Sequence, residues 1–75
     1  MRAYVLIKAP RKAREVAGKI GEIPGVKAAH ACWGVPDIIA EVEADNEAAL
    51  ESLVLEQVQA VEGVVGTDTH IVLGE

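Results

Sequence analysis

The chain has 75 residues, of which 51% are hydrophobic but only 3% aromatic, so its core has to be built from Val, Ala, Ile and Leu. The net charge of -5 repels a phosphate backbone and disfavours direct binding of nucleic acid. The apolar stretches fall short of the ~20 residues that a membrane span needs, the N-terminus lacks the regions of a signal peptide, and the single cysteine excludes an internal disulfide. We therefore expect a cytoplasmic protein that contacts neither membrane nor DNA.

The first half of the chain predicts a strand, a helix and a second strand. Arg2 to Lys8 alternates and is rich in aliphatic residues, which is typical of a strand, and Pro10 ends it. Apolar residues then recur at helical spacing until Pro24-Gly25 stops the helix. A second strand is predicted from Val26 to Trp33. The apolar positions of the helix are Ala13, Val16, Ala17 and Ile20.

The second half repeats this plan. Gly34-Val35-Pro36-Asp37 predicts a turn, and Ile38 to Ala44 predicts a third strand. Asp45 is the expected N-cap of a second helix, which Glu62-Gly63 closes before a final strand from Val64 to Leu73. The expected apolar face of this helix comprises Leu50, Leu53, Val54, Gln57, Val58 and Val61.

A weak internal sequence repeat supports the order βαββαβ. Five residues of the first half recur at a constant offset of 38 in the second. Two interlocking βαβ-like units of this kind predict a ferredoxin-like α+β fold, a four-stranded antiparallel sheet with two helices on one face. With no linker between the halves, residues 1–75 are expected to form a single domain. The matching positions are Val16, Ile20, Ile23, Gly25 and Val26 with Val54, Val58, Val61, Gly63 and Val64.

The first predicted strand is apolar on both faces. Ala3, Val5 and Ile7 lie on one face, and Tyr4 and Leu6 on the other. Two helices cover only one face of such a sheet, and a chain this short buries only about 60% of its unfolded surface. We therefore expect a second subunit to cover the other face, in a dimer or a higher oligomer.

The residues that carry metal or nucleophilic chemistry are few. His30 and His70 on edge strands, with Cys32 or Asp37, could bind zinc in principle, but no short ligand spacing is present. We expect no metal and no cofactor, and we interpret Cys32 as a small buried or interfacial hydrophobe. The carboxylates and the basic Arg11-Lys12-Ala13-Arg14 cluster are interpreted as solvated surface.

The turn after Trp33 is more informative. Backbone N–H groups, an aromatic wall and the Asp37 carboxylate are what a zwitterionic small molecule requires. The alternative is an ordinary hairpin turn in which Asp37 bonds its own backbone. Thr67 and Thr69 alternate on the last strand and either offer hydroxyls to a ligand or are present only as β-formers.

Taken in order, these segments resemble the effector-binding half, or RAM domain, of the Lrp/AsnC transcription regulators. The resemblance covers nearly the whole chain and begins at the first strand, so we expect no preceding helix-turn-helix. Its parts are Ala3-Tyr4-Val5-Leu6-Ile7, Ile23-Pro24-Gly25-Val26, Trp33-Gly34-Val35-Pro36-Asp37-Ile38-Ile39, Val42-Glu43-Ala44-Asp45 and the closing Val61-Glu62-Gly63-Val64 with Thr67-Asp68-Thr69-His70-Ile71-Val72-Leu73.

The resemblance implies sheets that pair face to face into dimers, dimers that associate into rings, and amino-acid effectors bound where dimers meet. Gly34 and Asp37 match the Gly-Xaa-Tyr-Asp hairpin of the family, whereas Val35-Pro36 depart from it. Thr67 and Thr69 match its threonine pair, and Trp33 replaces a smaller residue. These seven residues are the predicted effector site.

The sequence thus predicts a non-enzymatic, stand-alone RAM module that binds a small amino acid and regulates transcription, by joining a full-length Lrp/AsnC regulator or by competing for its effector. Two alternatives stay open. One is a small cofactor-independent enzyme of the same architecture, although aromatic residues and a nucleophile–base pair are lacking. The other is a purely structural assembly module without a ligand.

Overall fold

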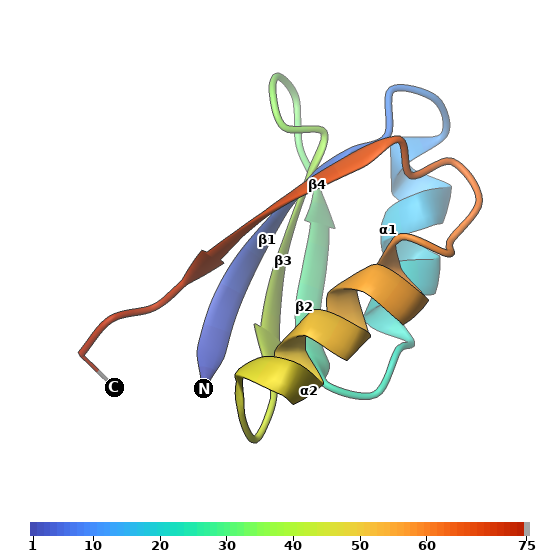
Figure 1. Ribbon diagram of the computed structural model, residues 1–75. Coiled ribbons are helices and arrows are strands. Elements are labelled where there is room, and N and C mark those ends of the chain that lie inside the picture. The colour runs from blue at the N-terminus through green and yellow to red at the C-terminus, as the bar shows by residue number, and fades with distance from the viewer. Residues whose placement is uncertain (75) are drawn as a thin grey trace.

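A computed structural model describes residues 1–74 and confirms the ferredoxin-like α+β fold (Figure 1). The four strands form one antiparallel sheet in the order β2-β3-β1-β4, so β1 is central, as its apolar sequence requires. The elements are β1 (Arg2–Lys8), α1 (Ala13–Gly21), β2 (Val26–Ala31), β3 (Ile38–Glu43), α2 (Glu47–Ser52), the π-helical η1 (Leu53–Val58) and β4 (Gly66–Ile71).

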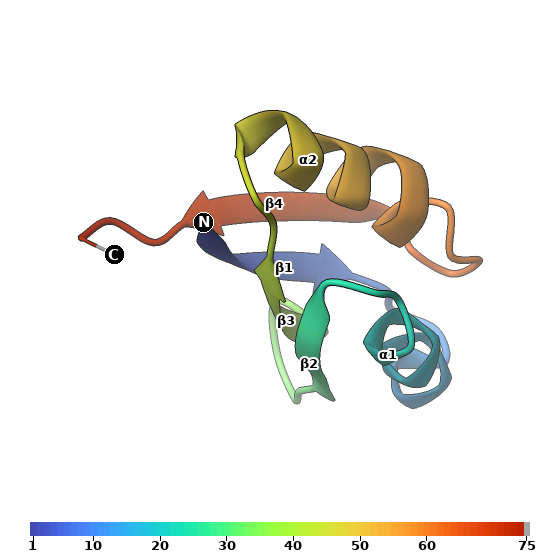
Figure 2. The same cartoon turned by 90° about the horizontal axis from the view of Figure 1, so that it is seen from below.

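Both helices lie on the same face of the sheet (Figure 2). On this face Ala3, Val5 and Ile7 of β1 are fully buried. Val16, Ala17 and Ile20 of α1 are buried against them, as the helical spacing predicted. The rest of the core comes from β3 and the second helix, and comprises Ile38, Ala40, Val42, Leu50, Leu53, Val54 and Val58, with Ala9.

The same turn follows the helix in each half, after α1 ends at Gly21 and η1 ends at Val58, earlier than the predicted stops at Pro24-Gly25 and Glu62-Gly63. Gly25 has a φ of 98° and Gly63 a φ of 105°, a region that favours glycine. The backbone N–H of Val26 donates to Ile23, and that of Val64 donates to Val61, at 3.0 and 3.1 Å. The internal repeat of the sequence therefore corresponds to a repeated structural unit.

The second helix differs from its prediction in two ways. Its N-cap is Asn46 and not Asp45, because the Asn46 side chain accepts a 2.8 Å hydrogen bond from the Ala49 N–H. The helix also widens into a π-turn at η1, which inserts an extra residue into the turn. The apolar stripe therefore passes from Val54 to Val58, and Gln57 is exposed rather than part of that face.

Three strands are shorter than predicted. β3 ends at Glu43 and not at Ala44, and β4 ends at Ile71 and not at Leu73. β2 stops at Ala31, because the next N–H, of Cys32, donates to the Asp37 carbonyl and closes the hairpin. β4 starts at Gly66, because Val64 belongs to the turn after η1.

The face of the sheet opposite the helices is uncovered by residues 1–74; we call it the open face. Its centre is apolar, since Leu6 pairs with Ile39 and Tyr4 is 39% exposed. Charged residues border this centre in ion pairs of 3.5 Å, Arg2 with Glu41 and Lys27 with Glu43.

Candidate functional site

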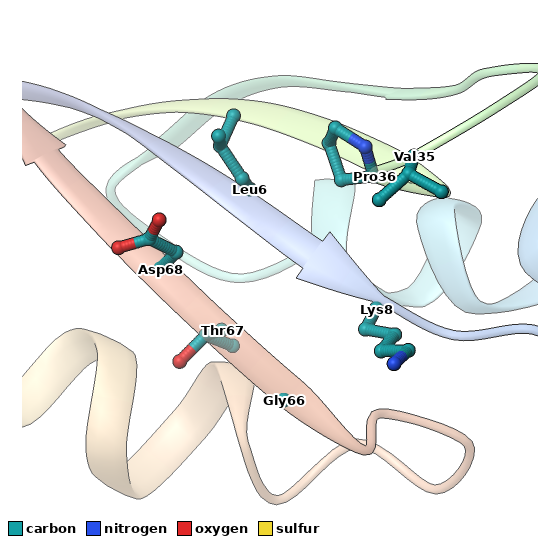
Figure 3. Close-up of a pocket in the computed structure, with 7 residues that line it drawn as sticks. All are labelled: Leu6, Lys8, Val35, Pro36, Gly66, Thr67 and Asp68. Carbon is teal, nitrogen blue, oxygen red and sulfur yellow. The ribbon is translucent and has the colours of Figure 1, made fainter.

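A hollow of about 450 Å³ opens where the β2–β3 hairpin meets the ends of β1 and β4; we call it the Lys8 hollow (Figure 3). Gly66 pairs with Lys8 across the strands, and its missing side chain leaves free space there. The lining residues are Leu6, Lys8, Val35, Pro36, Gly66, Thr67 and Asp68.

The hollow combines one positive and one negative group with apolar walls. Lys8 is exposed at the end of β1 and has no ion-pair partner within residues 1–74. The Asp68 carboxylate lies on β4 opposite Leu6, and its Oδ2 is 3.1 Å from Nε2 of His70. Val35 and Pro36 supply the apolar wall from the hairpin side (Figure 3).

Asp37 fixes the hairpin that carries this wall. Its Oδ2 accepts a hydrogen bond from the N–H of the buried Ala9 at 2.8 Å, and its own N–H donates to the Ile7 carbonyl at 3.1 Å. These bonds join the start of β3 to the end of β1. Asp37 therefore holds the turn in position. Gly34, with a φ of 116°, allows the chain to reverse its direction there.

Trp33 lies apart from the Lys8 hollow. It is fully exposed and lines a second depression with Lys12 and Arg14, which we call the Trp33 hollow. The Trp33 hollow is formed between the end of β2 and the start of α1. The turn thus divides its residues, with Val35 and Pro36 on one side and Trp33 on the other.

The two threonines point to the helix side of the sheet, since they pair with the buried Ile7 and Val5. The Thr67 hydroxyl accepts a 2.7 Å hydrogen bond from Gln59 Nε2. Thr69 lines a groove between α2 and β4 that is separate from the Lys8 hollow. Of the predicted site residues, Val35, Pro36 and Thr67 line the Lys8 hollow, although the Thr67 side chain points to the helix side, whereas Trp33 and Thr69 line other depressions.

The two histidines are exposed on edge strands, as predicted, but they are not close to each other. His30 and His70 lie on β2 and β4, which are both edge strands, but these are opposite edges of the sheet, so the two rings are not neighbours. Cys32 is exposed and not buried within its subunit. Among residues 1–74 no cluster of three or more His, Cys, Asp or Glu could hold a metal ion.

The comparison with known protein families agrees with this fold. The family model described as the Lrp/AsnC ligand binding domain matches residues 2–75. The chain belongs to this family. No curated protein matches this chain. Within residues 1–74, which the structure describes, no helix of this Lrp/AsnC domain is long and apolar enough to cross a membrane.

Solved structures resemble the Lrp/AsnC domain over nearly its whole length. Hypothetical protein PHS023 from Pyrococcus horikoshii is 32% identical, with a TM-score of 0.86 over 99% of this chain and 90% of that one. TTHA0845 from Thermus thermophilus is 25% identical, with a TM-score of 0.89 over 99% and 94%. The transcriptional regulator NMB0573 from Neisseria meningitidis, solved as an L-Met complex, shares the fold at 23% identity and a TM-score of 0.84; the match covers 99% of this chain and 50% of the regulator.

Two charged residues of the Lys8 hollow in this Lrp/AsnC domain, Lys8 and Asp68, were not predicted as site residues. Lys8 reads as the polar end of a strand, and Asp68 as one alternating residue of another. The signal that links them is register, because Leu6 pairs with Asp68 and Lys8 with Gly66. Strand alternation puts Leu6 and Lys8 on one face of β1, and only the pairing of β1 with β4 puts Asp68 on that face and brings it to the same hollow.

Proposed function

We propose that this Lrp/AsnC domain is a regulatory module that binds a free amino acid in the Lys8 hollow. The observation that carries the proposal is the pairing of opposite charges across an apolar depression. The Lys8 ammonium suits the ligand's α-carboxylate and the Asp68 carboxylate suits its α-ammonium. Leu6, Val35 and Pro36 then contact an apolar side chain. The L-Met complex of the N. meningitidis regulator supports this ligand class.

Within one chain the Lys8 hollow is open, and Val35 at its wall is 96% exposed. Binding sites for small molecules bury most of the ligand surface. We therefore propose that a second subunit closes the hollow. The other four predicted site residues then act on the site indirectly or from a neighbouring subunit. Asp37 and Gly34 fix the turn, and the remaining two are Trp33 and Thr69.

The open face supports a dimer in which two sheets pack face to face. Leu6, Ile39 and Tyr4 offer the apolar centre that such packing requires, and the ion pairs around them form a polar rim. Higher assemblies are then built from these dimers. A bound amino acid would shift the equilibrium between assembly states by its difference in affinity for them.

We propose further that the module acts in the cytoplasm and regulates transcription, by joining a full-length Lrp/AsnC regulator or by competing for its effector. Binding is favoured over catalysis because Lys8 and Asp68 in the hollow match the two charged ends of an amino acid, and neither Tyr4 nor His30 lines the Lys8 hollow, the Trp33 hollow or the α2–β4 groove. An acid–base catalyst has to reach the reacting group directly.

Calorimetric titration of the protein with each of the twenty amino acids, combined with light scattering, tests the proposal. We expect one or a few amino acids to bind and to change the mass of the assembly. Absence of heat from all twenty, with an unchanged mass, would reject amino-acid sensing and leave the fold and family intact.

A further inference from the structure

His70 lies next to Asp68 on one face of β4, just outside the Lys8 hollow. Alternate residues of a strand share a face, so Gly66, Asp68 and His70 follow one another along β4 at intervals of two residues. Gly66 pairs with Lys8 at the hairpin end, which puts Asp68 between Lys8 and His70 (Figure 3). His70 does not line the hollow itself, so it influences a ligand there through Asp68.

The two side chains are joined by a hydrogen bond. Nε2 of His70 lies 3.1 Å from Oδ2 of Asp68. Because an ionised carboxylate only accepts hydrogen bonds, Nε2 carries the hydrogen and donates it whether the ring is neutral or charged. This bond occupies Oδ2 and leaves Oδ1 for a donor in the hollow. Within residues 1–74, Asp68 is the one side chain with which His70 forms a hydrogen bond or an ion pair.

The neighbouring strands add several polar groups to the surroundings of His70. Tyr4 of β1 lies directly opposite it, with Lys8 farther along the same face of β1. Glu41 of β3 lies beyond Tyr4 and pairs with Arg2 at 3.5 Å. Of these residue types, histidine alone ordinarily changes its charge between pH 5 and 8. The charge beside Asp68 therefore varies with pH through His70.

We propose, on the basis of the function proposed above, that His70 positions the Asp68 carboxylate and makes amino-acid binding depend on pH. The neutral ring holds Oδ2 and keeps Oδ1 available to the α-ammonium of the ligand. The charged ring forms an ion pair with Asp68 and puts a second positive charge beside that ammonium. The ligand then competes with His70 for one carboxylate and is repelled by the ring.

The size of the effect follows from the exposure of the pair. The two side chains are 58% and 73% exposed, so the ring exchanges protons with solvent and water screens its charge. Exposed ion pairs are weak, and we expect the affinity to fall by about two- to fivefold between pH 8 and pH 5.5. Because coupling between two ligands is reciprocal, binding of the amino acid should also release part of a proton from the ring.

Calorimetry at pH 8, 6.5 and 5.5 tests this dependence. L-methionine is the first probe, because it is bound in the N. meningitidis regulator, and the other nineteen amino acids follow. An amino acid with an apolar side chain keeps both of its charges over this range, so a change in affinity reports on the protein. Titrations at pH 6.5 in two buffers of different ionisation enthalpy measure the released proton. Affinities are compared at protein concentrations where light scattering gives the same mass at each pH.

Two substitutions of His70 separate its orienting role from its charge. His70→Gln keeps an N–H donor for Asp68 but cannot gain a charge, so its affinity should not vary with pH and it should release no proton. His70→Ala also lacks the donor and should bind about two- to fivefold more weakly at pH 8, a loss that glutamine should recover. His30→Gln is the matched control. It removes the other histidine, on the opposite edge strand, and should keep the pH profile of the wild type.

Three results would overturn the inference and leave amino-acid binding in place. These are equal affinity of the wild type at pH 8 and 5.5, tighter binding at the lower pH, and a pH profile that survives in His70→Gln. Absence of binding by all twenty amino acids at every pH would instead reject the proposed function, and the role of His70 with it.

Discussion

The carboxylate of Asp37 and the backbone N–H of Ala9 are joined by a 2.8 Å hydrogen bond across 28 positions of the chain. Ala9 is fully buried, so its N–H has little access to water. This bond ties the start of β3 to the end of β1 and fixes the hairpin on which Val35 and Pro36 reach the Lys8 hollow. Asp37 therefore has a structural role that does not depend on a ligand.

Asp37→Ala should lower the free energy of unfolding by about 1–3 kcal/mol, because it leaves the Ala9 N–H without its acceptor. Asp37→Asn should cost less, since an amide oxygen still accepts. Urea denaturation measures both. If Asp37→Ala is as stable as the wild type, the bond to Ala9 contributes nothing to the fold.

Gly63→Ala should destabilise the protein by about 1–3 kcal/mol. A Cβ there would lie 2.8 Å from Cγ2 of Val16, at a φ of 105°. Gly18→Ala on α1 is the control, because an added Cβ meets nothing within 4 Å. That helical substitution should stabilise by about 0.5–1 kcal/mol. Thermal melts that showed the same change for both variants would contradict the steric explanation.

Asn46→Ala should lower stability by about 0.5–2 kcal/mol, because it removes the acceptor for the Ala49 N–H. Asp45→Ala is a matched control one residue earlier and should change stability by less than about 0.5 kcal/mol. Chemical denaturation of the pair distinguishes the N-cap found here from the one predicted by sequence. A larger loss for Asp45→Ala would reverse the assignment.

Lys8→Gln and Asp68→Asn should each weaken binding of the amino acid by about tenfold or more, since each removes one charge-assisted contact. Calorimetry with the amino acid that binds the wild type measures the loss. Lys27→Gln is the control, because Lys27 pairs with Glu43 and does not line the hollow. Unchanged affinity in both variants would place the ligand elsewhere.

Ile39→Asp should disrupt the open-face dimer, because it puts a charge at the centre of the apolar surface opposite Leu6. Light scattering should give one chain for this variant and at least two for the wild type. Val65→Asp adds the same charge at a residue that is 65% exposed outside the strands and should remain dimeric. A dimeric Ile39→Asp would exclude this face as the interface.

Local patterns predicted the elements well because strands and helices are defined by short-range periodicity. The repeated Val16 and Val54 positions correctly predicted two helices with a buried face, whereas the helices end at Gly21 and Val58, four and five residues before the predicted stops at Gly25 and Gly63. The π-turn at η1 was missed, since nothing in the local spacing distinguishes it from a regular helix. Gln57 was therefore assigned to the wrong side.

The candidate site was less predictable, because its residues are joined by strand pairing and by a turn. The sequence singled out Trp33 and Asp37 as neighbours in the chain. In the fold, Trp33 lines one hollow, while Asp37 bonds Ala9 and supports another. Lys8 and Asp68 are 60 residues apart in the chain, and no local pattern indicates that they line the same depression.

A short, acidic and aliphatic sequence determined by itself that this chain forms a βαββαβ domain of the Lrp/AsnC type with one uncovered sheet face. Composition and period were sufficient for the elements and the uncovered face, since they specify which residues are buried; the family was indicated by the resemblance of the ordered motifs. Only the tertiary structure decided which charges share a hollow and which lie apart. Those relations depend on the register of β1 with β4 and on the direction of the hairpin, and both are fixed by contacts between residues distant in the chain.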